Sequence, residues 1–350
     1  MTMIQPEVYL EHGSPMKIVA WMIALAVAVA GFDAQADAPP PIIIKFSHVV
    51  ASDTPKGKAA ERFKQLAEKA TGGRVRVDVY PNNQLYKDKE ELEALQLGAV
   101  QMLAPSLAKF GPLGVREFEV FDLPYIFPSK EVLYRVTDGP IGQSLLKKLE
   151  TKGITGLAFW DNGLKVMSSN KPMRMPADLK GLKMRIQPSK VLDAQMRALG
   201  ASPQALSFGE VYQALQSGVV DGTENPPSNF YTQRMYELQR HLTVSNHGYL
   251  GYAVIVNKKF WDGLPIGIRL ALEGAMKEAT KYANTIAQKE NEDALEAIQK
   301  SGKTTVYVLS EKEKEEWRKA LLPVHKDMEN RIGKDLLAEV YREASVHASK

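Results

Sequence analysis

The sequence predicts a two-lobed α/β fold in which one long helix crosses both lobes. The chain has 350 residues, which is enough for two lobes of ordinary domain size. Short apolar strand patterns alternate with amphipathic helix patterns, as in parallel sheets covered by helices. Residues 268–300 show helical spacing and contain no proline. At 1.5 Å per residue this helix would extend ~50 Å, which is longer than one lobe of this size.

The first strand–helix–strand unit establishes this pattern. Residues 42–47 form a continuous apolar strand pattern, as expected for a strand buried on both faces. The cluster at residues 52–55 is typical of a helix cap, and the helix that it predicts covers residues 56–71. An alternating strand pattern follows at residues 75–80.

The same order of elements continues along the chain. Further strands are predicted over residues 100–104, 154–160, 167–169, 182–186 and 252–256, and further helices over 88–97 and 189–199 and from 310 onward. We assign residues 37–161 and 251–290 to the first lobe, and residues 162–250 and 291–350 to the second. Ligands of open α/β sheets bind beyond the carboxyl ends of the strands. We therefore expect a cleft between the lobes that closes about a hinge.

The amino-terminal segment predicts export. Residues 18–32 form one uncharged apolar run, shorter than the ~20 residues of a membrane span. An Ala-Gln-Ala sequence ending at Ala36 follows and matches a signal-peptidase site. We predict a signal peptide over residues 1–36 and a periplasmic mature protein. The residues before Met16 are acidic rather than basic, so Met16 is the better start of the leader. An uncleaved signal anchor is the alternative.

Composition argues against several classes of protein. The chain has no cysteine, which excludes disulfides, thiolate metal sites and a cysteine nucleophile. Its net charge of +4 is mild and its basic residues are interleaved with acidic ones, so we expect no nucleic-acid partner. No zinc helix, nucleophile elbow, phosphate loop or dinucleotide fingerprint occurs in the sequence. Binding is therefore favoured over catalysis, with no cofactor or metal.

Three polar side chains lie at predicted strand ends or in a rigid loop. Lys165 follows an apolar strand and a turn, and Asn225 lies in the proline-flanked loop over residues 222–227. Arg185 is opposite in phase to its apolar neighbours in a short strand, so it faces the other side of the sheet. An arginine fork is able to bind a carboxylate bidentately.

Each of these residues also has a simpler interpretation. Arg185 fits a surface strand residue, Lys165 a solvated turn lysine, and Asn225 a turn residue that precedes proline. On spacing alone the simpler interpretation is favoured for Lys165 and Asn225.

Several segments match one known family in the same order. They include FSHVVASDTPKGKAAERF, FDLPYIF, WDNGLKVMSSNKP, DLKGLKMRIQPS and GASPQALSFGEVYQALQSGVVDGTENPPSNFYTQ. From about Ile44 to Gln299 the chain resembles the periplasmic solute receptors of TRAP (tripartite ATP-independent periplasmic) transporters, most closely their four-carbon-dicarboxylate-binding branch. The resemblance implies the two-lobed periplasmic solute-binding protein fold with hinge strands. It also implies no enzymatic activity, and delivery of an organic acid to a sodium-driven membrane permease.

The resemblance further implies roles for individual residues. The family's selectivity arginine falls on Arg185, the amide of Asn225 also reaches the ligand carboxylate, and Phe208 forms an aromatic wall. Lys165 matches a second cationic residue that is arginine in the sialic-acid branch. Lysine at this position argues against sialic acid.

A dicarboxylate needs a second cationic or amide-rich end in the first lobe, where the resemblance places three pocket loops. Lys56 and Lys87 lie in two of these loops, each at a helix start that favours anions, and Lys87 directly precedes Asp88, the predicted cap of its helix. Solvated helix-start lysines are the alternative interpretation of both. Ser106 in the third loop and Trp160 at a strand end complete the predicted ligand-binding set.

Together these observations predict a monomeric extracytoplasmic receptor for a C4-dicarboxylate such as succinate, malate or fumarate. The alternative ligands are 2-oxo, hydroxy and aromatic acids. Two other classes stay open, namely a receptor that reports its ligand to a membrane kinase and a periplasmic enzyme acting on organic acids.

Overall fold

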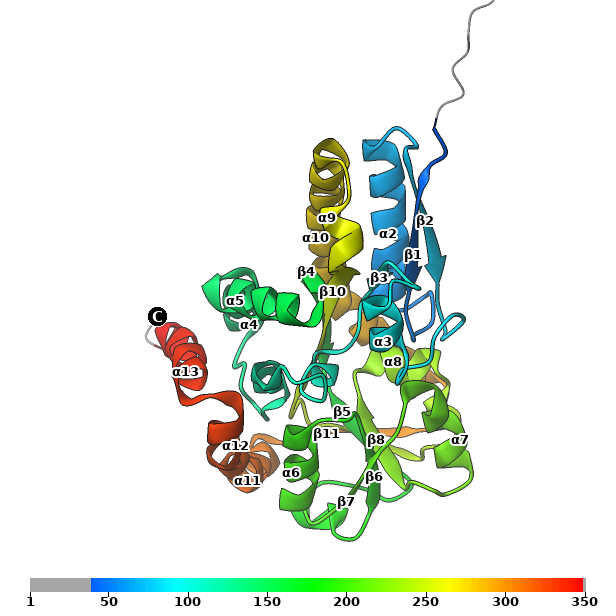
Figure 1. The fold of residues 1–350 in the computed structure, drawn as a ribbon. Helices are drawn as coiled ribbons and strands as arrows, with labels where there is room; N and C mark the ends of the chain where they lie inside the picture. Colours follow the sequence, from blue (N-terminus) through cyan, green and yellow to red (C-terminus); the bar gives the residue numbers. More distant parts are fainter. Residues whose placement is uncertain (1–38, 349–350) are drawn as a thin grey trace, which may run out of the picture. The chain divides into compact units, whose positions relative to one another are not determined.

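Two β-sheets and the helices packed on them make up the part of the chain that the computed structural model describes, residues 39–348 (Figure 1). The predicted signal peptide and its cleavage site lie outside these residues. From residue 41 onward the chain forms one unit by its contacts. Within the described residues, no helix has both the length and the apolar character needed to cross a membrane.

The first sheet has the strand order β2-β1-β3-β10-β4. Its parallel half is the predicted strand–helix–strand unit, in which β1 (Ile42–Ser47) lies between β2 (Val75–Tyr80) and β3 (Met102–Leu103). β10 (Tyr249–Asn257) is antiparallel to β3 and to β4 (Ile154–Leu164). Every residue of β10 is buried, because the strand is central and covered on both faces.

The second sheet has the order β11-β9-β5-β8-β6-β7. Its strands are β5 (Val166–Ser169), β6 (Lys183–Ile186), β7 (Ser202–Ala205), β8 (Gly222–Asn225), β9 (His241–Val244) and β11 (Thr305–Val308). Residues 222–227 are therefore not the loop that the sequence predicts, because residues 222–225 pair with β5 on one side and β6 on the other. Gly222 and the Pro226–Pro227 pair are typical of a turn, and this local signal masks the four-residue strand.

The chain passes between the two sheets at two places that lie side by side. The first passage is the single residue Lys165 between β4 and β5, and the second is the segment 245–248 between β9 and β10. The Lys165 amide donates to the carbonyl oxygen of Gly248 at 2.8 Å, which bonds the passages directly. Such paired strands suit a hinge. The exact lobe boundaries stay a prediction.

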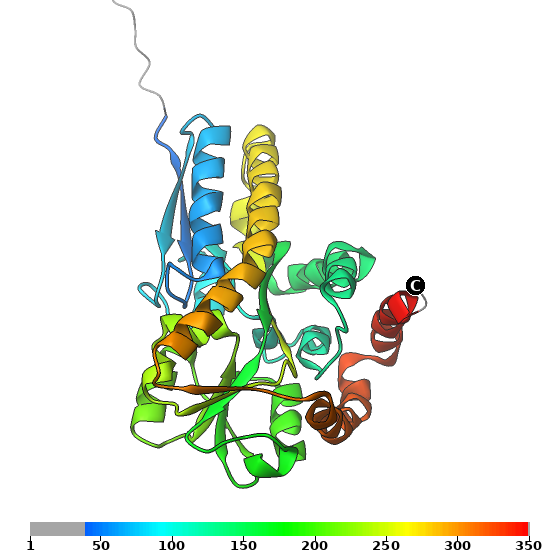
Figure 2. The same cartoon turned by 180° about the vertical axis from the view of Figure 1, so that it is seen from behind.

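The long helix, α10 (Ile266–Lys300), has 35 residues and confirms the predicted crossing helix. It packs against α2 (Pro55–Ala70) and β4 beside the first sheet, and against α8 (Pro227–Thr232) and β11 beside the second. Figure 2 shows it running past both sheets. Its buried face repeats alanine every fourth residue at 275, 279, 283 and 287, which lets neighbouring elements approach closely.

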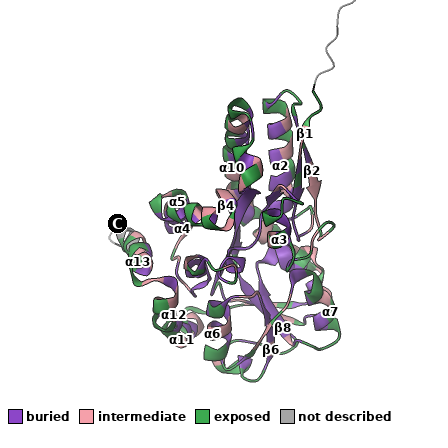
Figure 3. Ribbon diagram, in the orientation of Figure 1, coloured by how far each residue is buried: buried purple, intermediate pink, exposed green. Residues whose placement is uncertain are grey.

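The remaining helices cover the sheets, in which every residue of β5, β8 and β10 is buried (Figure 3). They are α3 (Glu91–Gln96), α4 (Lys130–Asp138), α5 (Pro140–Lys148), α6 (Lys190–Ala198), α7 (Val211–Gln216), α9 (Lys258–Asp262), α11 (Glu311–Leu321), α12 (Pro323–Ile332) and α13 (Lys334–Ala348), with short 3-10 segments such as η2 (Arg116–Asp122) and η5 (Phe208–Glu210). We assigned α12 and α13 to the second lobe. In the structure α12 contacts both η2 and α6, whereas α13 contacts α4 and α5, which precede the first passage.

Helix α3 is shorter than the predicted helix over residues 88–97. It begins at Glu91, and no side chain caps it. Asp88, which the sequence suggests as its cap, instead accepts a hydrogen bond from the distant Phe208 amide and pairs with Lys109. A tertiary contact therefore overrides the local capping signal.

The side chain that caps the N-terminus of α2 is predicted to stabilise the first lobe, and a substitution tests this. Thr54 Oγ1 accepts from the Gly57 amide at 3.1 Å and donates to the Ala51 carbonyl oxygen at 2.7 Å. We expect Thr54→Ala to lower the free energy of unfolding by about 1 kcal/mol, the usual cost of a lost cap. Urea denaturation measures this. Thr285→Ala on the exposed side of α10 is the control, and an equal loss in both variants would contradict the capping role.

Candidate functional site

A small cavity lies between the two sheets. Its volume is about 290 Å³, including space open to solvent. It lies beyond the carboxyl ends of β1, β3, β6 and β8, where α/β proteins bind ligands. Its lining residues are Val49, Val50, Lys56, Asp88, Ser106, Lys109, Gln187, Phe208, Asn225, Asn229, Leu250 and Tyr252. Four of the eight sequence-predicted site residues line the cavity, namely Lys56, Ser106, Phe208 and Asn225.

Lys56 is a fully buried cation in the cavity wall. Its Nζ donates to the Ala104 carbonyl oxygen at 2.9 Å and lies 3.8 Å from the ring centroid of Tyr252. Burial lowers the pKa of Lys56 to about 7, against the opposing effect of Glu91. No acidic side chain in the described part of the chain forms a salt bridge with it. An anion in the cavity would therefore stabilise the protonated, charged form of Lys56.

Amide and hydroxyl groups supply the rest of the polar lining. Ser106 Oγ donates to Gln187 Oε1 at 3.1 Å, which joins the β3 side of the cleft to the β6 side. Asn225 Nδ2 donates to Thr223 Oγ1 at 3.2 Å, and Asn229 Nδ2 donates to the Tyr252 hydroxyl at 3.3 Å. These groups can reorient to donate to a ligand oxygen.

Arg185 lies next to this lining without being part of it. The side chain is 1% exposed, and Nε and Nη2 both donate to the Leu206 carbonyl oxygen, at 3.0 and 2.8 Å. The guanidinium carbon lies 5.8 Å from the ring centroid of Phe208. Within residues 39–348 no carboxylate lies within salt-bridge distance of it, and burial lowers its pKa. A guanidinium has five N–H donors, and the side-chain hydrogen bonds of Arg185 in the described residues all go to one carbonyl oxygen. The guanidinium therefore lacks a carboxylate partner.

Lys165, by contrast, already has an acidic partner. Its Nζ lies 2.8 Å from Glu224 Oε1, and both side chains are 2% exposed. The same carboxylate contacts His247 Nε2 at 2.8 Å and accepts from Gln195 Nε2 at 3.1 Å. Burial opposes ionisation of Glu224, yet Lys165 and His247 lower its pKa to about 2. Lys165 therefore contributes little net charge toward a ligand.

The chain Ser245–His247–Glu224 has the connectivity of a nucleophile, a base and an acid. Ser245 Oγ lies 2.7 Å from His247 Nδ1. Burial lowers the pKa of His247, so the neutral ring donates from Nε2 to Glu224 and accepts from Ser245. Ser245 is 1% exposed and does not line the cavity. The arrangement holds the second passage in place and does not favour the enzyme alternative.

Lys87 and Trp160 do not join the cavity lining. Lys87 is exposed, because the turn before α3 directs it outward while its neighbour Asp88 faces the cavity. Trp160 is wholly buried in the core of the first sheet, where it packs on Phe46 and donates to Thr280 Oγ1 at 2.9 Å. Direct ligand contact by either residue stays a prediction without geometric support.

Several lining residues were not predicted from the sequence. Gln187 directly follows a predicted strand, so the rule on carboxyl strand ends would have identified it. Tyr252 lies inside a predicted strand and Asn229 in an unpredicted helix, and neither carries a local signal. Lys109 pairs with Asp88 and Glu91, both far away in sequence, so only the tertiary fold reveals this cluster.

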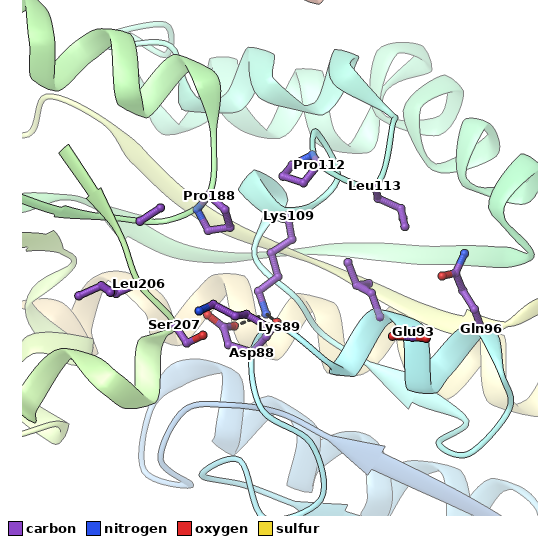
Figure 4. A pocket seen from close by; sticks show the side chains of 12 residues that line it. Asp88, Lys89, Glu93, Gln96, Lys109, Pro112, Leu113, Pro188, Leu206 and Ser207 are labelled. Carbon is purple, nitrogen blue, oxygen red and sulfur yellow. Dashed lines mark hydrogen bonds and ion pairs between the residues drawn. The ribbon is translucent and has the colours of Figure 1, made fainter.

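A second pocket lies on the outer side of the Asp88–Lys109 pair (Figure 4). It is larger and more open than the cavity, with a volume of about 950 Å³ that includes open solvent. Among the described residues no group of three His, Cys, Asp or Glu side chains is arranged to hold a metal ion. The buried amine of Lys56 and the amides in the cavity lining are groups that suit an anion.

Two sheets joined by paired passages, a crossing helix and a cavity between them are the features of a two-lobed solute-binding protein. The model of the bacterial extracellular solute-binding protein family 7 matches residues 46–331, and the chain belongs to this family. One relative, the C4-dicarboxylate-binding periplasmic protein DctP of Rhodobacter capsulatus, is 68% identical over 86% of this chain and 90% of its own length.

Solved structures share the fold. A TRAP periplasmic solute-binding protein of Sulfurospirillum deleyianum with bound succinate is 46% identical, with a TM-score of 0.83 over 86% of this chain and 98% of that one. A TRAP periplasmic solute-binding protein of Pseudomonas aeruginosa with bound L-malate is 44% identical, with a TM-score of 0.80 over 82% of this chain and 100% of that one. The predicted family and fold are confirmed.

The buried amine of Lys56 predicts a pH dependence of stability. Its pKa is about 7 in the folded protein and lies near its ordinary value of 10.5 in the unfolded chain. Between these values the unfolded chain binds the extra proton, so stability rises with pH. Relative to Lys56→Met, the wild-type free energy of unfolding should increase by roughly 1 kcal/mol per pH unit between pH 7 and 9. Urea denaturation measures this, and a flat difference would contradict the assignment.

Proposed function

We propose that the protein is a periplasmic receptor that binds a C4-dicarboxylate such as succinate, malate or fumarate and delivers it to a TRAP membrane permease. The observation that carries this proposal is the guanidinium of Arg185, which is buried beside the cavity and has no acidic partner in the described chain. A carboxylate of the ligand would complete this pair. The names of the relatives support the ligand class and the periplasmic location.

Charge balance favours a carboxylate at Arg185 over one at Lys165. Leaving a buried cation without a counter-ion is costly, and a bidentate carboxylate offsets that cost with two charge-assisted hydrogen bonds. Lys165 already shares the carboxylate of Glu224. We therefore propose Arg185 as the primary anchor, with the Asn225 amide beside it and Phe208 as the aromatic wall.

The second carboxylate is proposed to bind at Lys56. This amine lines the cavity, whereas the amine of Lys87 is exposed to solvent. Lys56 also lies in the first turn of α2, which adds the positive end of the helix dipole. Ser106 and the Tyr252 hydroxyl lie on the same cavity wall and would complete the polar contacts.

Ligand capture is proposed to work by lobe closure. The bonds Ser106–Gln187 and Phe208–Asp88 already join the two sides of the cleft, so the contacting surfaces are complementary. A dicarboxylate held by Arg185 on one side and Lys56 on the other would stabilise the closed form, which is a population shift by differential binding. The closed form would then dock on the permease. We propose transport without catalysis, by a monomer.

Replacement of Arg185 tests the anchor. We expect Arg185→Ala to weaken succinate binding by roughly 30-fold or more, because one partner of a buried charge pair is lost. Isothermal titration calorimetry measures the affinity. Arg197→Ala is the matched control, since this arginine is exposed on α6 and pairs with Asp193. Unchanged succinate affinity in Arg185→Ala would refute the proposed anchor.

A comparison of the two candidate lysines tests the second end of the site. Lys56→Met should weaken succinate binding by roughly tenfold or more while changing binding of a monocarboxylate such as butyrate much less. Lys87→Met should leave both affinities unchanged, because its side chain is exposed. Competition calorimetry compares the two acids. Equal losses for both acids in Lys56→Met would show that Lys56 does not select the second carboxylate.

A further inference from the structure

Two pockets lie on opposite sides of the same chain segments. Asp88 and Lys109 line both the cavity and the outer pocket. On the other side of the cleft, Gln187 lines the cavity and the next residue, Pro188, lines the outer pocket. Figure 4 shows the Lys109 side chain extending toward Asp88 among the residues that line the outer pocket. The ion pair of these two residues is therefore the partition between the pockets.

The partition is fixed from both sides of the cleft. Asp88 Oδ2 accepts from the Phe208 amide at 3.0 Å, while Asp88 Oδ1 forms a salt bridge with Lys109 Nζ. Lys109 Nζ also pairs with Glu91 and donates to the Asp88 carbonyl oxygen at 3.0 Å. The three ionic side chains are at most 5% exposed. A partition bonded in this way moves only if the lobes separate.

The outer pocket suits an apolar chain with a charged end. Leu92, Leu113 and Leu206 contribute apolar walls, and Pro112 and Pro188 add rigid ones. Lys89 also lines it, and its Nζ lies 3.8 Å from Glu210 with both side chains more than half exposed. The pocket could therefore accept methylene groups inside and a carboxylate near its rim.

We propose that Asp88 is a specificity-determining residue whose carboxylate forms the end wall of the cavity and limits the length of the dicarboxylate. This inference rests on the proposed function. An acid that is too long occupies the place of the Asp88 carboxylate, so the Phe208 amide loses its acceptor and the lobes do not close fully. The free energy of lobe closure is therefore less favourable with a longer dicarboxylate than with a shorter one.

The role of Asp88 as the end wall is tested by measuring how two Asp88 variants bind dicarboxylates of increasing chain length. Binding of succinate, glutarate and adipate is measured by calorimetry on the wild-type protein, Asp88→Ala and Asp88→Asn. The wild type should prefer succinate over adipate. Asp88→Ala opens the outer pocket, so the ratio of adipate to succinate affinity should rise roughly tenfold, as expected for two more buried methylene groups. Asp88→Asn has the same size and can still accept from the Phe208 amide, so it should keep the wild-type preference.

The possible results separate this inference from the proposed function. An unchanged chain-length preference in Asp88→Ala, in a protein whose wild type binds succinate, would overturn the wall. An equal shift in Asp88→Ala and Asp88→Asn would overturn it too, because charge rather than size would then set the limit. A wild type that binds no dicarboxylate refutes the proposed function itself. Circular dichroism checks folding, and Asp88→Ser replaces Asp88→Ala if the alanine variant does not fold, with the same expectation.

Discussion

The buried carboxylate of Glu224 holds together the two chain passages on which the fold depends. It binds Lys165 in the first passage and His247 in the second, each at 2.8 Å. Removing one partner of such a buried pair typically costs about 3–5 kcal/mol, so the network strongly constrains the hinge. Because Glu224 precedes Asn225 in β8, the same strand carries both the hinge network and a cavity amide. The position of the binding groups thus follows from the position of the hinge.

The Glu224 network also determines which cation is available to a ligand. Lys165 is matched by a carboxylate, whereas Arg185 is held only by the carbonyl oxygen of Leu206 within the described chain. Lys56 likewise has a carbonyl oxygen and an aromatic ring instead of an acid. We propose that a dianionic ligand compensates both cations, Lys56 in the cavity wall and Arg185 beside the cavity. Burial makes each of them sensitive to a counter-ion, because electrostatic interactions are stronger away from water.

Much of the fold could be predicted from the sequence, because its longer elements carry strong periodic signals. The strand over residues 42–47 and the helix over 268–300 are clear from apolar spacing, and the phase of Arg185 in its short strand indicates that it faces away from its apolar neighbours. The bond between Asp88 and Phe208 joins residues 120 positions apart, and no local pattern encodes it. For the same reason the capping signal at Asp88 gave a helix start that is too early.

The same distinction between local signals and long-range contacts applies to the predicted site residues. Family resemblance placed Lys56 and Ser106 in pocket loops of the first lobe, and both loops follow predicted strands, where α/β sheets bind ligands. Lys87 has an equivalent local pattern but faces solvent, since sequence cannot tell which of two adjacent side chains a turn directs inward. Family resemblance contributed the role of Phe208, for which spacing gave no signal. The Glu224 partner of Lys165 was not predicted, because the two residues meet only when β5 pairs with β8.

The most direct measurement is a crystal structure of the protein grown with succinate. The account predicts one succinate carboxylate within hydrogen-bond distance of the Arg185 guanidinium and the Asn225 amide. The other carboxylate should lie beside Lys56, and the Asp88–Phe208 bond should be intact at the end of the cavity. Succinate bound elsewhere, or bound in the cavity while Arg185 still contacts only the Leu206 carbonyl oxygen, would contradict the central claim.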